Sequence, residues 1–147
     1  MVGTETTGTS DRYAQRRAFR VLVVDDSATS RASVADALRT AGYQVETAAD
    51  GEQALRTCAA VEPHLIVLDV VLPKMNGYQV CRRLKKLGGG RDVRVVMLSS
   101  KSQAADRYWG LKQGADGYLA KPWQPEELVA CVDRFLLGQG AGSNGAC

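Results

Sequence analysis

The sequence predicts an α/β fold in which helices cover both faces of a five-stranded parallel β-sheet. Short apolar runs alternate five times with stretches whose apolar residues recur at helical spacing, which is the pattern of βαβ units. Four of the five runs end in acidic, hydroxyl or basic residues, as expected where strand ends meet at a ligand-binding edge. The chain has 147 residues, which suits a single folded domain with one core.

Five apolar runs have the length and composition of strands. Most are continuous in Val, Leu, Ile or Met, as strands buried on both faces of a parallel sheet are, whereas the second is shorter and more polar, as an edge strand is. Right-handed crossovers put helices on both faces of the sheet. We expect the order 2-1-3-4-5, which places the first and third strands side by side with their carboxyl ends at the switch point. The expected strands are residues 20–25, 43–47, 64–69, 93–98 and 116–120.

Capping residues place the five expected helices between and after these strands. Ser27 can cap the first helix and Gly42 can end it, while Asp50 with Gln53 three residues on resembles a capping box for the second. Pro125 suits the first turn of the last helix. The expected helices are residues 27–41, 50–59, 76–87, 103–113 and 125–136.

Apolar spacing predicts which face each helix buries. Trp109 lies off the apolar stripe of the fourth helix, so we expect its side chain at the surface. The residues expected to face inward are Val80, Leu84 and Leu87 in the third helix, and Ala104, Tyr108 and Leu111 in the fourth.

The two ends of the chain have the composition of flexible segments. Residues 1–18 are polar and aperiodic, and residues 138–147 are rich in Gly, Ala, Ser and Asn. We therefore expect a folded domain at residues 19–137 between a flexible arm and a flexible tail. Because the arm lacks the apolar core of a secretion signal and no stretch is apolar enough to cross a membrane, we expect a cytoplasmic protein.

Charge and cysteine usage exclude several classes of function. The formal net charge is +3, and no run of Lys or Arg exceeds two residues, which argues against direct nucleic-acid binding. The four cysteines and the single histidine, His64, do not have the spacing of a metal site.

Acidic, hydroxyl and basic residues follow four of the expected strands. Asp25 and Asp26 follow the first, Asp69 ends the third, and Ser99 and Lys121 follow the fourth and fifth. The carboxyl ends of strands in an open parallel sheet gather at one edge, so these side chains should meet. Crowded carboxylates repel one another unless a cation joins them, and hard oxygen ligands suit Mg²⁺, or Mn²⁺ in its place. The pattern predicts a divalent metal beside a reactive carboxylate.

Taken together, these motifs resemble the receiver domain of two-component response regulators, over residues 20–137. The resemblance implies a flavodoxin-like receiver fold. The stretch from Ser102 to Tyr118 is similar to stand-alone, chemotaxis-like regulators of twitching motility by type IV pili. The matching motifs are Asp25-Asp26-Ser27, Asp69 with Pro73 and Gly77 downstream, Ser99-Ser100-Lys101 and Lys121-Pro122.

The resemblance implies a role for each residue that would meet the phosphoryl group. Asp69 would accept it, Ser99 would donate a hydrogen bond to it, and Lys121 would pair with its charge. Tyr118 would be the aromatic switch residue that responds when Ser99 moves. The Lys121-Pro122 bond is often cis in this family.

The resemblance also implies the ligands of the metal and the course of hydrolysis. Asp26 and Asp69 would bind Mg²⁺ directly, Asp25 would bind it through water, and the backbone carbonyl of Val71 would complete the protein ligands. Val71 and Lys101 flank the path of the hydrolytic water in the family. Since valine cannot hydrogen-bond water, we expect slow loss of the phosphoryl group.

The implied function is phosphorylation-controlled binding of a protein partner. A histidine kinase would donate the phosphoryl group, and phosphorylation would reshape a face carrying Lys101, Trp109 and Tyr118 for a downstream target. The chain would catalyse only its own phosphorylation and dephosphorylation, would contact neither nucleic acid nor membrane directly, and would be a monomer or weak dimer. The finer similarity implies motility or chemotaxis-like signalling.

Three other functions share parts of this pattern. A phosphohydrolase of the haloacid dehalogenase type needs a second acid two residues after the nucleophile, where this chain has Val71. A flavodoxin-like FMN carrier needs a hydroxyl-rich phosphate loop after the first strand, where Asp25 and Asp26 would repel the phosphate. A DNA-binding regulator needs a further domain, whereas we expect only a short tail after the last helix.

Overall fold

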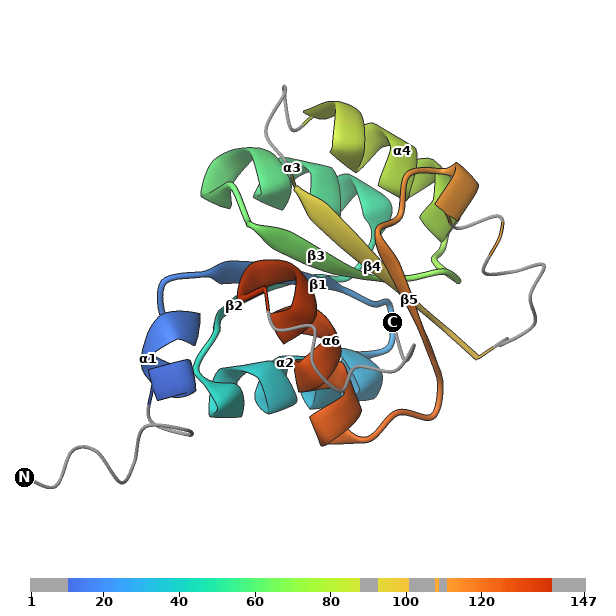
Figure 1. Cartoon of the computed structure of the whole chain (residues 1–147). Coiled ribbons are helices and arrows are strands. Elements are labelled where there is room, and N and C mark those ends of the chain that lie inside the picture. The colour runs from blue at the N-terminus through green and yellow to red at the C-terminus, as the bar shows by residue number, and fades with distance from the viewer. Residues whose placement is uncertain (1–10, 88–92, 101–107, 109–110, 139–147) are drawn as a thin grey trace, which may run out of the picture.

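The computed structural model describes residues 11–87, 93–100, 108 and 111–138. Five parallel strands form one sheet in the order β2-β1-β3-β4-β5, which confirms the predicted α/β fold and strand order (Figure 1). Among the helices that the structure describes, none combines the length and apolarity needed to span a bilayer. The strands are β1 (Arg20–Val24), β2 (Gln44–Ala48), β3 (Leu65–Asp69), β4 (Arg94–Ser99) and β5 (Gly117–Ala120).

Helices cover both faces of this sheet, with α2 and α6 on one side and α3 and α4 on the other (Figure 1). The predicted caps form: the Ser27 side chain accepts the Ser30 N–H, and the Asp50 side chain accepts the Gln53 N–H. Gly42 ends α2 at a φ of 117°, a left-handed conformation that favours glycine. The described helices are α1 (Arg12–Arg16), α2 (Ala28–Ala41), α3 (Gly51–Val61), α4 (Gly77–Leu87) and α6 (Pro125–Leu136).

Alternate residues of the central strands fill two apolar layers, one on each face of the sheet. Val21 and Val23 of β1 face α2 and α6, whereas Leu22 and Val24 face α3 and α4. All five residues of β3 are buried, which is why its sequence is a continuous apolar run up to Asp69. The core thus holds β1 and β3 rigidly beside each other, with their carboxyl ends at the same edge.

Helix α1 differs from the expectation of a flexible arm over residues 1–18. Arg16 donates through Nε and Nη2 to the two carboxylate oxygens of Asp133 in α6, at 3.0 and 2.7 Å. Its Nη1 donates to the Ala41 carbonyl at 3.1 Å. These contacts hold the short helix in place although it has no buried residue of its own.

Two of the predicted inward-facing stripes need correction. Leu87 is 44% exposed because it is the last residue of α4, whereas Val80 and Leu84 are buried as predicted. Tyr108 and Leu111 are 55% and 50% exposed, so the prediction that they face the core is wrong. The apolar layer beside β5 is completed by other residues, Ala115 and Tyr118. The rest of the helix expected at residues 103–113 lies largely outside the described residues.

Candidate active site

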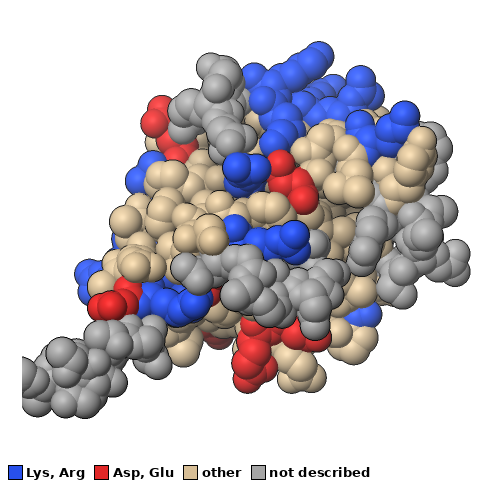
Figure 2. All heavy atoms as spheres, viewed as in Figure 1, with Lys and Arg blue, Asp and Glu red and all other residues tan. Residues whose placement is uncertain are grey.

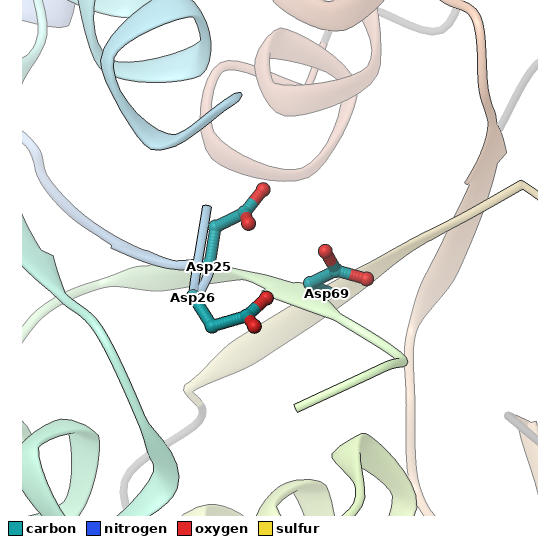
Figure 3. Close-up of side chains that lie close together, drawn as sticks. All are labelled: Asp25, Asp26 and Asp69. Carbon is teal, nitrogen blue, oxygen red and sulfur yellow. The ribbon is translucent and has the colours of Figure 1, made fainter. Parts of the chain in front are cut away.

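Three carboxylates meet beyond the carboxyl ends of β1 and β3, as the sequence predicted. One oxygen from each of Asp25, Asp26 and Asp69 can be chosen so that all lie within 4.8 Å of one another. The parallel register pairs Val24 with Leu68, so the residues that follow them arrive side by side. Figure 3 shows the three side chains projecting from these strand ends, with the carboxylate of Asp26 directed towards Asp69.

Asp25 is the buried and anchored member of the cluster, at 1% exposure. Its Oδ1 accepts the Ser27 N–H at 2.9 Å, and its Oδ2 accepts the Ser30 hydroxyl at 2.5 Å. Arg31 donates to its backbone carbonyl at 2.9 Å. The first turn of α2 therefore fixes Asp25 in place, whereas Asp26 is exposed and open to a ligand.

Sequence reasoning did not identify Ser30 and Arg31 as supports of this acidic pair. Both lie in the first turn of α2, and that turn begins directly after the strand-end acids. Polar residues in the first turn of a helix that follows an acidic strand end are the signal that could have identified them.

Asp69 is 6% exposed and is oriented by two donors. The Val71 N–H donates to its Oδ1 at 3.1 Å, and Lys121 Nζ donates to its Oδ2 at 3.1 Å. Burial raises the pKa of the Asp69 carboxyl above its usual value, as does the nearby Asp25 charge, although the Val71 N–H and Lys121 act in the opposite direction. A divalent cation would remove this unfavourable crowding of negative charge.

Ser99 and Lys121 reach the same place because β4 and β5 continue the sheet beyond β3. Asp69 pairs with Leu98, and Ser99 pairs with Ala120, so the ends of three adjacent strands lie in a row. The Lys121 N–H also donates to the Ser99 carbonyl at 2.7 Å. Ser99 is 3% exposed, and the Lys121-Pro122 peptide bond is cis.

The remaining predicted site residues have different outcomes. Tyr118 is 3% exposed and lies in the apolar layer that contains Met97, its partner across β4 and β5. Val71 is 66% exposed and lies beside Asp69. The role of its backbone carbonyl as a metal ligand stays a prediction. Lys101 and Trp109 lie outside the described residues, so their place on a partner-binding face stays a prediction.

Gly77 owes its identity to the close approach of α4 to the loop after β3. A Cβ atom at this position would lie 2.6 Å from the Asp69 carbonyl oxygen and 2.7 Å from Val70 Cα. The Gly77 N–H donates to the Val70 carbonyl at 2.8 Å. The sequence motif contained this glycine, and the structure gives its reason: the helix start presses directly on the backbone of Asp69.

The donor set of this site fits a small hard cation. Its protein ligands are carboxylate oxygens from two adjacent strand ends, which is the chemistry that Mg²⁺ selects. The exposed Asp26 leaves one side open, and Mg²⁺ commonly keeps water and substrate oxygens among its ligands. The acidic cluster therefore fits the predicted Mg²⁺ cofactor.

A family model described as the response regulator receiver domain matches residues 21–133, which include all of the sheet except Arg20, the first residue of β1. Among curated relatives, the "Probable transcriptional regulator ycf27" of Cyanophora paradoxa is 44% identical over 117 residues, 80% of this chain and 48% of the relative. The chain spans about half the length of the curated relatives that it matches.

Solved structures of the same fold include single receiver domains. Chemotaxis protein CheY4 of Vibrio cholerae superposes with a TM-score of 0.74 at 34% identity, covering 80% of this chain and 98% of that one. The receiver domain of sensor histidine kinase PA1611 from Pseudomonas aeruginosa has a TM-score of 0.74 at 31% identity, covering 82% and 98%. The latter was solved with a magnesium ion coordinated in its active site cleft.

Proposed function

The chain belongs to the response regulator receiver domain family, and we propose that Asp69 is the residue that a histidine kinase phosphorylates. Receivers of this family accept a phosphoryl group on an aspartate, with Mg²⁺ bound by an acidic cluster. The observation that supports Asp69 is its position: it is the buried last residue of β3, held by Lys121 and by the Val71 N–H. Asp25 and Asp26, by contrast, come from the neighbouring strand and lack contact with this lysine among the described bonds.

The proposed reaction is a displacement at phosphorus. A carboxylate oxygen of Asp69 attacks the phosphorus of a phosphohistidine, the P–O bond forms as the P–N bond breaks, and the histidine nitrogen keeps the bonding electrons. Lys121 lies 3.1 Å from the Asp69 carboxylate, where its charge offsets that of the phosphoryl oxygens. When bound, Mg²⁺ supplies further positive charge for these oxygens. Outside this reaction and the hydrolysis of the aspartyl phosphate to aspartate and inorganic phosphate, we propose no enzymatic activity.

We propose that phosphorylation of Asp69 changes the structure of the next strands of the sheet, β4 and β5. The phosphoryl group carries a charge of about −1.5 to −2, which replaces the single negative charge of the free carboxylate. We assign the hydrogen bond to the new phosphoryl oxygen to the Ser99 hydroxyl, because Ser99 is buried at the end of the adjacent strand. Tyr118 lies one strand further, packed in the apolar layer next to β4, and is our proposed switch residue.

Two kinds of output remain open to this receiver. The first is phosphorylation-dependent binding of a downstream protein, which the similarity to chemotaxis protein CheY4 over 98% of that chain favours. The second is control of transcription, which the names of the curated relatives favour. The finer prediction of twitching motility has no support among these relatives and stays a prediction.

The proposal is tested by phosphorylating the purified chain with acetyl phosphate and Mg²⁺ and measuring its intact mass. The wild type should gain one phosphoryl group, and Asp69→Asn should gain none because its amide is not a nucleophile. Asp36→Asn is the matched control, since Asp36 is an exposed aspartate of α2 away from the strand ends, and it should be phosphorylated normally. Undiminished phosphorylation of Asp69→Asn would refute the assignment.

A further inference from the structure

A surface hollow between α3 and α4 combines an apolar floor with a positively charged rim. Its volume is about 570 Å³. A second hollow of about 250 Å³ adjoins it, shares Arg83 and Lys86 with it, and adds Gln79 and Arg82. We call the two together the α3–α4 groove. The larger hollow is lined by Leu55, Arg56, Ala59, Arg83, Lys86 and Leu87.

The positive charge of the α3–α4 groove is not neutralised by the part of the chain that the structure describes. Its four cationic residues are exposed, and none forms an ion pair or side-chain hydrogen bond there. Among the described residues, no acidic side chain lines either hollow. Figure 2 shows the Lys and Arg side chains gathered at the top of the molecule, over α4. The four residues are Arg56, Arg82, Arg83 and Lys86.

Contributions to folding stability explain only some of the cationic and apolar residues at this surface. Lys85 is used internally, because its Nζ donates to Asp116 at 3.0 Å and to the Val93 carbonyl at 2.7 Å. A cation in the last turn of α4 also complements the helix dipole, which accounts for Lys86. Arg56 lies on the other helix, and Leu87 stays 44% exposed where burial would be favourable.

The larger hollow of the groove lies at the end of α4 that is remote from the phosphorylation site, whereas the smaller hollow extends to Gln79 near the start of the helix. Helix α4 follows β3 and runs back along the sheet, so its last residue, Leu87, is at the edge opposite the one that holds Asp69. A ligand seated in the larger hollow would therefore leave the acidic cluster open.

We propose that the α3–α4 groove binds an acidic amphipathic helix of a partner protein. The apolar face of such a helix would cover Leu55, Ala59 and Leu87, and its Glu or Asp side chains would pair with the four cations of the rim. Nucleic acid could meet the charged rim through its phosphates, but its backbone has no apolar side chains to fill the floor. The apolar floor and the uncompensated rim together therefore favour the protein partner.

A synthetic helical peptide tests this proposal directly. The probe is a fluorescein-labelled peptide with Leu on one helical face and Glu on the other, titrated with the whole chain and followed by fluorescence anisotropy. Binding should weaken as salt is added, since the distance over which exposed charges attract one another, about 8 Å at physiological ionic strength, shortens as salt increases. A peptide with Lys in place of Glu and one with Ser in place of Leu should not bind. Amide chemical shifts should change at residues of α3 and α4.

Variants decide whether the groove is responsible for binding. The double variant Arg83→Glu, Lys86→Glu should lower the peptide affinity by about tenfold, because two exposed charge pairs become repulsive. Leu87→Ser should also weaken binding. Lys112→Glu is the matched control, because Lys112 is exposed but does not line the groove, and it should bind normally. Circular dichroism should show all variants folded, since the altered side chains lie at the surface.

The outcome is independent of the phosphorylation proposal, because Asp69→Asn should bind the peptide as wild type does. The proposal is overturned if no acidic peptide binds, if binding survives both groove variants, or if the shifts map to α2 and α6. It is also overturned if a DNA duplex binds the groove more tightly than the peptide and Leu87→Ser leaves that binding unchanged.

Discussion

The ion pair between Arg16 and Asp133 should contribute measurably to the stability of the domain. Asp133 is 3% exposed, and Arg16 donates to both of its carboxylate oxygens. Removing one partner of a buried ion pair costs about 3–5 kcal/mol, because a charge stays buried without its counterion. In Arg16→Ala the carboxylate keeps the Tyr43 hydroxyl at 2.5 Å and Arg12 at 3.5 Å. These remaining contacts reduce the expected loss to about 2 kcal/mol.

Urea denaturation of Arg16→Ala, followed by circular dichroism, measures this loss as a change in the free energy of unfolding. For a domain of this size, about 2 kcal/mol corresponds to a fall of about 8 °C in Tm. Arg17→Ala is the matched control, because Arg17 is the adjacent arginine and its side chain is exposed; it should stay within about 0.5 kcal/mol of wild type. Equal stabilities of Arg16→Ala and Arg17→Ala would show that the ion pair does not anchor α1.

Three further substitutions probe the site itself. Asp26→Ala should weaken Mg²⁺ binding, measured by titration, yet unfold no more easily without metal, because it relieves repulsion among three carboxylates; unchanged Mg²⁺ affinity would contradict this. Val71→Asn should lose its phosphoryl group severalfold faster than wild type, because Asn can hydrogen-bond the attacking water at this exposed position; an equal or slower rate would count against the idea. Gly77→Ala should lose about 1–3 kcal/mol of stability to crowding, because its Cβ would lie 2.6 Å from the Asp69 carbonyl oxygen. A Tm equal to that of wild type would mean that the loop after β3 moves to accommodate the added methyl group at no cost in stability.

The sheet and its acidic edge could be predicted because local sequence determines them. A strand buried on both faces must be apolar throughout, so an acid at its end is conspicuous, as Asp69 is after Leu65–Leu68. Right-handed crossovers put helices on both faces of the sheet, and the order 2-1-3-4-5, one of the common orders of such sheets, brings Asp25 and Asp69 together. The predicted site therefore followed from patterns within single segments and one general rule of topology.

Features that depend on contacts between residues far apart in the chain could not be predicted from local sequence patterns. Helix α1 has no apolar stripe, and its main anchor is an ion pair with a residue 117 positions away in the chain. Periodicity predicts the inner face of a helix, but it does not show how far neighbouring elements cover that face. Leu87, Tyr108 and Leu111 are exposed for this reason, and only the assembled structure reveals the groove that Leu87 lines.

The most direct test of the central claim is to map the phosphorylated residue chemically. The chain would be phosphorylated with acetyl phosphate and Mg²⁺, reduced with borohydride to convert aspartyl phosphate to homoserine, digested, and sequenced by tandem mass spectrometry. The account predicts homoserine at Asp69 alone, and none when Mg²⁺ is removed with a chelator. Homoserine at Asp25, at Asp26 or at another aspartate, with Asp69 unmodified, would contradict it.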